Sequence, residues 1–150
     1  MKIRTDYVTN SSSSSFILGF KDKEEIEDIM NQLPYYWSEE VKNNIVSDIK
    51  NGIISKEHAL SFYQTSLREW SWRFRGKEWW DLTTAERESN EYKEFIQQRK
   101  DEISQELINE LNEKEIISIV EYGDDDLLGS ELEHDVIPYL DETIRRISHH

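Results

Sequence analysis

Two short apolar runs that lack helical spacing lie far apart in the chain. The run at 14–20 is mainly aromatic and aliphatic, and the run at 116–122 is rich in β-branched residues and is followed by Gly123. Short runs of this kind, bounded by turn residues, are typical of buried strands. We therefore predict strands at 14–20 and 116–122 in one sheet, with 143–148 as either a last strand or a fraying helix end.

Between these runs, apolar residues recur every three or four positions, which is the spacing of an amphipathic helix. One such row of apolar residues, an apolar stripe, begins after Ser55 and continues to Gly76. Another begins after Thr83 and continues to about residue 112. We predict about four helices, of which the longest covers 84–112. Each stripe is preceded by a polar residue that can cap the first turn of a helix: Asp22, Ser38, Ser55 or Thr83.

Two segments near the C-terminus carry weaker patterns. Residues 124–133 are predicted to form an acidic loop after the second strand, and 136–140 is ambiguous because Pro138 fits only a turn or the first turn of a helix. A sheet that contains both chain ends and is covered by helices accommodates all of these segments. The predicted fold class is therefore α+β, with residues 1–150 forming a single domain.

Length and composition narrow the class of protein. A chain of 150 residues fits one compact domain, and its five Trp, seven Tyr and five Phe can supply a large apolar core. Because the chain has no cysteine, disulfides, thiolate nucleophiles and cysteine-ligated metal sites are excluded. The opening residues lack the apolar core of a signal peptide, and no apolar run approaches membrane-spanning length. We therefore expect a cytoplasmic protein that does not enter a membrane.

The formal net charge of -14 is unevenly distributed. Residues 1–100 hold 15 Lys and Arg against 17 Asp and Glu, a balance of -2, whereas residues 101–150 hold 3 against 15, a balance of -12. Such an acidic half repels phosphate backbones, which argues against a nucleic-acid partner. It suits divalent cations, a basic protein partner or mimicry of nucleic-acid charge, and it is also typical of a solvated acidic surface.

A run of hydroxyl side chains leads into the first predicted strand. Their hydroxyls and backbone N–H groups could cradle a phosphate or a carboxylate, as a backbone nest does. The run lacks the glycine and lysine pattern of a P-loop and no helix follows it directly, so a polar arm and a modification site are alternatives. The candidate ligand-binding residues are Ser11, Ser12, Ser13, Ser14 and Ser15.

Acidic residues and three of the four histidines gather in the last part of the chain. Imidazole and carboxylate together suit zinc, manganese or iron, so a divalent metal is the cofactor that we consider. The acids do not follow the pattern of an EF-hand, and neither a His-x-x-x-His pair nor a Gly-x-Ser-x-Gly elbow is present. A frayed chain end is the alternative, and enzyme activity stays open. The candidate metal ligands are Asp124, Asp125, Asp126, Glu133, His134, His149 and His150.

One aromatic segment, 68–80, carries a net positive charge. Trp70 continues the apolar stripe of the third predicted helix, which indicates core packing, whereas Trp72 lies off that stripe. Exposed Trp and Arg are frequent anchors of protein interfaces. We therefore predict Trp72, Arg73 and Arg75 as candidate partner-binding residues, with Trp72 exposed.

The opening of the chain has a distinctive sequence. Residues 2–10 are Lys-Ile-Arg-Thr-Asp-Tyr-Val-Thr-Asn and are followed by five serines and Phe16. This pattern resembles an N-terminal signature shared by small bacterial and phage proteins that have no established activity. A looser similarity to chain ends in the same group extends to residues 133–134 and 148–150. The resemblance implies a bacterial or phage origin and supplies no catalytic residue.

Two classes of function fit these features. The first is a protein-binding or inhibitory module that engages a basic host protein through its acidic half or anchors on its Trp–Arg segment. The alternative is a metal-dependent enzyme or a phosphate- or nucleotide-binding protein that uses the serine run and the C-terminal acids and histidines. We expect the first class, because it requires only a surface, whereas the second requires side chains to converge.

Overall fold

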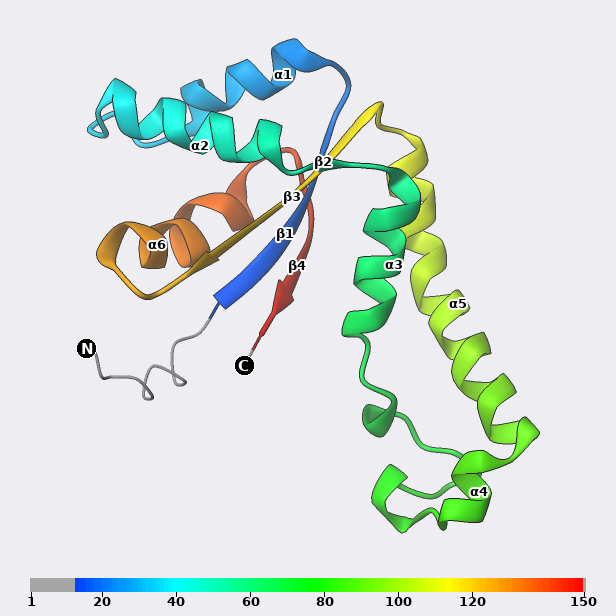
Figure 1. Cartoon of the computed structure of the whole chain (residues 1–150). Helices are drawn as coiled ribbons and strands as arrows, with labels where there is room; N and C mark the ends of the chain where they lie inside the picture. The colour runs from blue at the N-terminus through cyan, green and yellow to red at the C-terminus, as the bar shows by residue number, and fades with distance from the viewer. Residues whose placement is uncertain (1–12, 150) are drawn as a thin grey trace.

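The computed structural model describes residues 13–149 and contains a four-stranded antiparallel sheet (Figure 1). Its strands are β1 (Ser13–Phe20), β2 (Ile53–Ile54), β3 (Ile116–Gly123) and β4 (Thr143–Ser148). β1 pairs with β3 on one side and with β4 on the other, in the order β2-β3-β1-β4. The sheet therefore joins both ends of the described chain, and the predicted α+β class is confirmed.

Helices cover the sheet on both faces. The α-helices are α1 (Lys23–Asp28), α2 (Glu39–Asn51), α3 (Lys56–Ser66), α4 (Thr84–Glu88), α5 (Asn90–Asn112) and α6 (Leu127–Glu131). The four predicted capping side chains each accept a hydrogen bond from the backbone N–H three residues later, so the predicted helix starts are confirmed. None of the helices in the described part of the chain combines the length and the apolar composition needed to cross a membrane.

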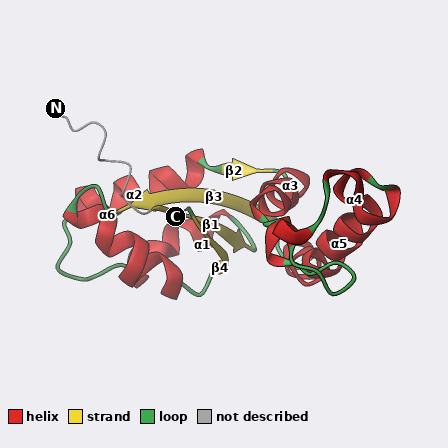
Figure 2. Ribbon diagram, turned by 90° about the horizontal axis from the view of Figure 1, so that it is seen from below, coloured by secondary structure: helices red, strands yellow, loops and turns green. Residues whose placement is uncertain are grey.

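β1 is buried on both faces because its side chains alternate between two cores. Phe16, Leu18 and Phe20 belong to a core with α1, α2 and the segment that follows α6. Ile17 belongs to a second core with Leu107 of α5 and with residues of α3. Figure 2 shows the sheet between α1, α2 and α6 on one side and α3 and α5 on the other. Burial on both faces explains why this strand is a continuous apolar run.

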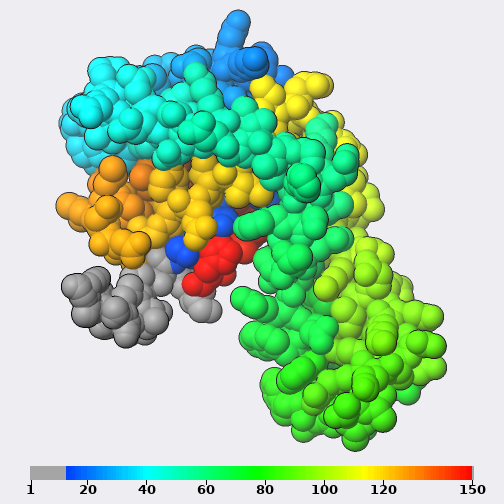
Figure 3. Space-filling model, in the orientation of Figure 1, coloured from blue at the N-terminus to red at the C-terminus, as the bar shows by residue number. Residues whose placement is uncertain are grey.

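Residues 67–100 form a small lobe that protrudes from the rest of the molecule, as Figures 1 and 3 show. We call these residues the lobe and the remainder of the chain the body. The lobe holds 8 Lys and Arg against 7 Asp and Glu, a balance of +1, and the body holds 10 against 25, a balance of -15. The lobe has its own buried core, which consists of Phe74, Leu82, Tyr92 and Ile96.

The third helix is shorter than predicted. α3 ends at Ser66 instead of continuing to Gly76, because residues 67–68 adopt an extended backbone. The hydroxyls of Thr65 and Ser66 each donate to the carbonyl three residues earlier, at 2.8 and 2.6 Å, local bonds that compete with the backbone ladder. Trp70 lies in a short 3-10 turn and is 53% exposed, so its predicted core position is wrong.

The longest predicted helix, 84–112, is divided in two. Ser89 separates α4 from α5 because its backbone is extended, with a ψ of 152°. Its hydroxyl oxygen accepts a hydrogen bond of 3.2 Å from the Tyr92 N–H and so caps α5. Apolar residues continue at helical spacing after the break, which is why spacing alone predicted one helix from residue 84.

The segment after β3 contains more helix than predicted. Asp126 caps α6 by accepting a hydrogen bond of 2.6 Å from the Gly129 N–H, and a π-helical turn, Leu132–Val136, follows directly. The prediction of an acidic loop at 124–133 is therefore wrong for most of its length. Pro138 lies in the first turn of a short 3-10 helix, one of the two positions that its ring allows.

Candidate functional site

The end of the sheet at which β1 begins brings three distant parts of the chain together. Ser13 lies opposite Gly123 at the end of β3, and Ser14 pairs with Ser148 at the end of β4. The serine run, the acidic turn after β3 and the C-terminal strand therefore meet at one place. The polar side chains there, which we call the polar centre, are those of Ser14, Asp124, Glu133, His134 and Arg146.

Glu133 is the buried member of the polar centre. It is 0% exposed and lies in the π-helical turn, a type of turn that is frequent at functional sites. The Ser14 hydroxyl donates to Glu133 Oε2 at 2.8 Å, and the Arg146 guanidinium lies 3.6 Å from the same oxygen. A buried carboxylate needs such partners, because removing a charge from water is costly. These contacts hold the carboxylate in a defined orientation at the end of the sheet.

Two exposed side chains extend the polar centre toward solvent. His134 Nε2 lies 3.2 Å from Glu133 Oε1, and ligand atoms of Asp124, Glu133 and His134 all lie within 4.8 Å of one another. Two ligands of one ion, each about 2.1 Å from it, lie roughly 3–3.5 Å apart, a spacing that His134 and Glu133 already have. Because the whole set is spread over as much as 4.8 Å, the three ligands would draw closer together around an ion. One imidazole and two carboxylates in this arrangement could hold a divalent metal ion and leave coordination positions open for water or a ligand.

His149 lies on the opposite face of the sheet from these three residues. Its Nε2 is 2.8 Å from the Ser15 hydroxyl oxygen. Side chains alternate along a strand, so Ser15 faces away from Ser14, whose hydroxyl contacts Glu133. The structure therefore does not bring His149 together with His134, and it does not support an ion shared by these two histidines.

The other residues of the two predicted sets fall in different places. Asp126 caps α6, and Asp125 is exposed and lies outside the group of possible metal ligands. Ser13 is half-buried, and its carbonyl accepts a hydrogen bond of 2.9 Å from the backbone of residue 149. The predicted residues that lie outside the described part of the chain are Ser11, Ser12 and His150.

Arg146 was not among the predicted site residues. This residue pairs with Phe16 across β4 and β1, so its side chain is on the same face as that of Ser14. Its Nε donates to Ser14 Oγ at 3.1 Å, and its side chain remains 36% exposed. The alternation of residues in 143–148 could have identified Arg146 only if the pairing register of β4 had been known.

In the lobe, the exposed aromatic side chains differ from the predicted one. Trp72 is half-buried against the lobe core, and the Arg99 guanidinium lies 5.9 Å from the centre of its ring. The prediction that Trp72 is exposed is therefore wrong. Trp70 and Trp80 are instead 53% and 62% exposed.

The two predicted lobe arginines are exposed and contact their neighbours. Arg73 Nε lies 3.2 Å from Glu78 Oε1. Arg75 has a φ of 52°, a left-handed conformation that is uncommon outside glycine, and its guanidinium lies 4.9 Å from the centre of the Phe74 ring. The turn at residues 74–77 therefore places cationic groups at the surface of the lobe.

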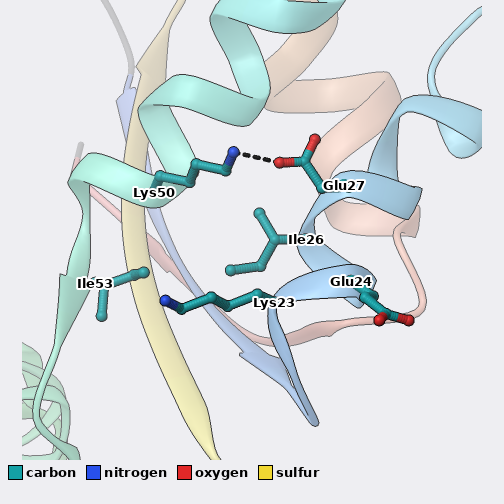
Figure 4. A pocket seen from close by; sticks show the side chains of 6 residues that line it. All are labelled: Lys23, Glu24, Ile26, Glu27, Lys50 and Ile53. Atoms are coloured by element: carbon teal, nitrogen blue, oxygen red, sulfur yellow. Dashed lines mark hydrogen bonds and ion pairs between the residues drawn. The ribbon is translucent and has the colours of Figure 1, made fainter.

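A cavity of about 420 Å³ lies between α1 and the end of α2, and Figure 4 shows the side chains around it. Glu27 and Lys50 form an ion pair across it, and the buried Ile26 contributes an apolar wall. Its polar groups are exposed lysine and glutamate side chains of balancing charge, so nothing rigid is present to orient a ligand. The cavity is lined by Lys23, Glu24, Ile26, Glu27, Lys50 and Ile53.

Comparison of the chain with protein-family models, curated proteins and solved structures gives no match. The fold and the polar centre together define a small α+β protein in which possible metal ligands gather at one end of the central sheet.

Proposed function

We propose that this protein binds a divalent metal ion at its polar centre, through Asp124, Glu133 and His134. The observation that carries the proposal is the fully buried Glu133 carboxylate, which is held in place beside an exposed imidazole and a second carboxylate. An oriented ligand with a hydrogen-bonded outer shell is the usual construction of a metal site, and Ser14 supplies that outer contact here. The mixed nitrogen and oxygen donors suit zinc, manganese or iron.

One basic side chain beside the candidate ion site offers a contact for an anionic ligand. Arg146 lies beside Glu133 and is partly exposed, so its guanidinium could bind a phosphate or carboxylate group that also occupies an open position on the metal. A metal that keeps such positions can polarise a bound ligand and activate water, as metal-dependent hydrolases do. This arrangement supports the class of metal-dependent enzymes and phosphate-binding proteins over a purely structural metal.

Thermal unfolding with and without added metal tests the proposal. At a metal concentration about 100 times the Kd, binding stabilises the folded state by about 2.7 kcal/mol, which corresponds to a rise in Tm of about 5–10 °C. We expect zinc or manganese to raise the Tm of the native protein, and the His134→Ala variant to lose most of this rise. His149→Ala is the matched control and should keep it, because His149 lies on the other face of the sheet. A rise that is equal in the native protein and in His134→Ala would contradict the assignment.

Protein binding is a second candidate function, and the lobe is the observation that favours it. Trp70 and Trp80 are exposed on a protruding element whose balance of charge is +1, while the body carries -15. Exposed Trp side chains are frequent anchors of interfaces. We infer that a binding or inhibitory module would anchor on the lobe, while the acidic body steers a basic host protein toward it.

The exposed Trp80 gives a direct test of the second candidate. Trp80→Ala should change the stability by no more than about 0.5 kcal/mol, because the side chain is largely in solvent. It should nevertheless abolish recovery of a specific protein from bacterial lysate at low salt. Tyr139→Ala, which removes an exposed aromatic ring from the body, is the control and should leave recovery intact. Equal recovery by the native protein and by Trp80→Ala would refute the lobe as the anchor.

A further inference from the structure

β3 has one edge that is only partly covered. β2 pairs with β3 only at Ser118 and Ile117, although β3 continues to Gly123. Residue 52, just before β2, adds one further bond, in which its carbonyl accepts from the Ile119 N–H at 3.0 Å. Within residues 13–149, no strand lies beside Val120 and the residues after it on this side of β3.

The direction of the backbone groups on this edge follows from three hydrogen bonds. The Gly19 N–H donates to the Glu142 carbonyl, and the Ser13 carbonyl accepts from the His149 N–H. The backbone N–H and C=O groups of the odd-numbered residues of β1 therefore point toward β4, and those of the even-numbered residues point toward β3. In β3, the Ile119 N–H points toward β2. In an antiparallel strand, the N–H and C=O of one residue point to the same side, and this side alternates from each residue to the next. The backbone groups of residues 120 and 122 therefore bond to β1. The N–H and C=O of residue 121 therefore point toward the open edge.

Two grooves adjoin this edge, one on each face of the sheet, and the second of them touches β3 only at Ile119. One has a volume of about 330 Å³ and is lined by Asp48 of α2 and by Tyr122. The other, of about 480 Å³, is lined by His58 and the exposed ring of Phe62 in α3. Both grooves are also lined by Ile119, so together they give room for the side chains of an added strand, which alternate between the two faces.

The charge of the edge selects the kind of partner. Asp48 and Glu121 are both exposed, and the body as a whole has a balance of -15. Burial and the nearby Asp48 carboxylate raise the pKa of Tyr122, so its phenol stays protonated and donates to Asp48 Oδ2 at 3.0 Å. A second copy of the chain would bring the same acids against each other, which disfavours pairing of two β3 edges. A basic segment meets no such repulsion.

We propose that the open edge of β3 binds an extended basic peptide segment of a partner protein by strand addition. The Glu121 backbone supplies the hydrogen bonds, a basic side chain lies against Asp48, and the next side chain, which is apolar, lies against Phe62. Strand addition combines main-chain affinity with side-chain selectivity in this way. The proposal is independent of the metal site and of the lobe, because it uses neither.

Titration with a short blocked peptide that alternates lysine and valine, followed by NMR, tests this proposal. We expect saturable shifts of the amide signals of residues 119–122 and slower hydrogen exchange of the Glu121 amide. Glu121→Pro removes the outward N–H without removing a bond to β1, since proline is tolerated on a strand edge. It should weaken binding at least about tenfold, as loss of one or two backbone hydrogen bonds would. Glu121→Gln is the matched control, which keeps the N–H and should weaken binding only about two- to threefold.

Several results would overturn the proposal. These are a peptide that does not bind at millimolar concentration, a peptide that binds Glu121→Pro as tightly as the native protein, and signal shifts that occur only elsewhere in the molecule. A peptide that alternates glutamate and valine should bind at least about tenfold more weakly, so equal binding would remove the role of charge. A dimer that forms in the absence of peptide, with residues 119–122 at its interface, would identify a second copy as the occupant. If Glu121→Pro does not fold, hydrogen exchange of the Glu121 amide in the native protein decides between these outcomes.

Discussion

Replacement of Phe16 by alanine is expected to lower the free energy of unfolding by about 3–5 kcal/mol. Phe16 lies within β1, is 0% exposed and packs in the core shared with α1, α2 and the segment after α6. The loss has two parts, because apolar contacts disappear and a close-packed core cannot fill the cavity that remains. Denaturant unfolding followed by tryptophan fluorescence measures it.

Tyr139→Ala is the matched control for this experiment. It also removes an aromatic ring, but Tyr139 is 77% exposed, so the expected change is within about 0.5 kcal/mol. If Phe16→Ala cost less than about 1 kcal/mol, β1 could not be the central strand around which the larger core is built.

Replacement of Glu133 by alanine, measured in chelator, is expected to lower the free energy of unfolding by about 2–4 kcal/mol. The variant leaves the Ser14 hydroxyl and the Arg146 guanidinium without the carboxylate that they contact. Arg146 is partly exposed, so water can solvate its guanidinium once the carboxylate is gone. The expected loss of stability is therefore smaller than for a fully buried ion pair. Because chelator removes any bound metal, the measurement reports all contacts of the carboxylate within the protein, including the one with His134 at 3.2 Å.

Glu133→Gln is the control for the alanine variant. Its amide oxygen can still accept from Ser14, so it should lose less stability than Glu133→Ala. If Glu133→Ala proves as stable as the native protein, the contacts of the buried carboxylate do no more than offset the free energy lost by removing it from water, and the expected loss of stability is contradicted.

The starts of the helices and the two main strands could be predicted from the sequence because their determinants are local. A capping side chain such as Ser38 bonds to a backbone N–H only three residues away. The strands at 14–20 and 116–122 were identifiable because they lack helical spacing and end at turn residues. Information of this kind lies within a few residues of each element.

The helix ends and the exposed aromatic residues could not be predicted, because a polar residue inside a helical pattern fits two conformations and because burial depends on distant contacts. Serine is compatible with both a helix interior and an N-cap position. In the structure the backbone of Ser89 is extended, so it is the N-cap of α5. Trp72 lies off the predicted stripe, but the lobe core formed around Tyr92 covers part of it. The spacing of apolar residues along one helix contains no information about the lobe core, which forms beyond the end of α3.

The polar centre was predictable in composition and not in geometry. The sequence places Asp124, Glu133 and His134 within one short stretch, and the structure brings their ligand atoms within 4.8 Å. Whether His149 joins them depends on which face of β4 it occupies, and a shift of one residue in register reverses that face. Arg146 enters the centre for the same reason, through the pairing of β4 with β1.

Calorimetric titration of the protein, free of affinity tags and treated with chelator, tests metal binding most directly. We predict that zinc or manganese binds with a stoichiometry of about one ion per chain at the three-ligand site. Glu133→Gln should weaken binding by about a hundredfold or more, because it removes the oriented ligand, and His149→Ala should leave it unchanged. The absence of stoichiometric binding by the native protein, or equal affinity in Glu133→Gln, would contradict a metal centre at the end of the sheet.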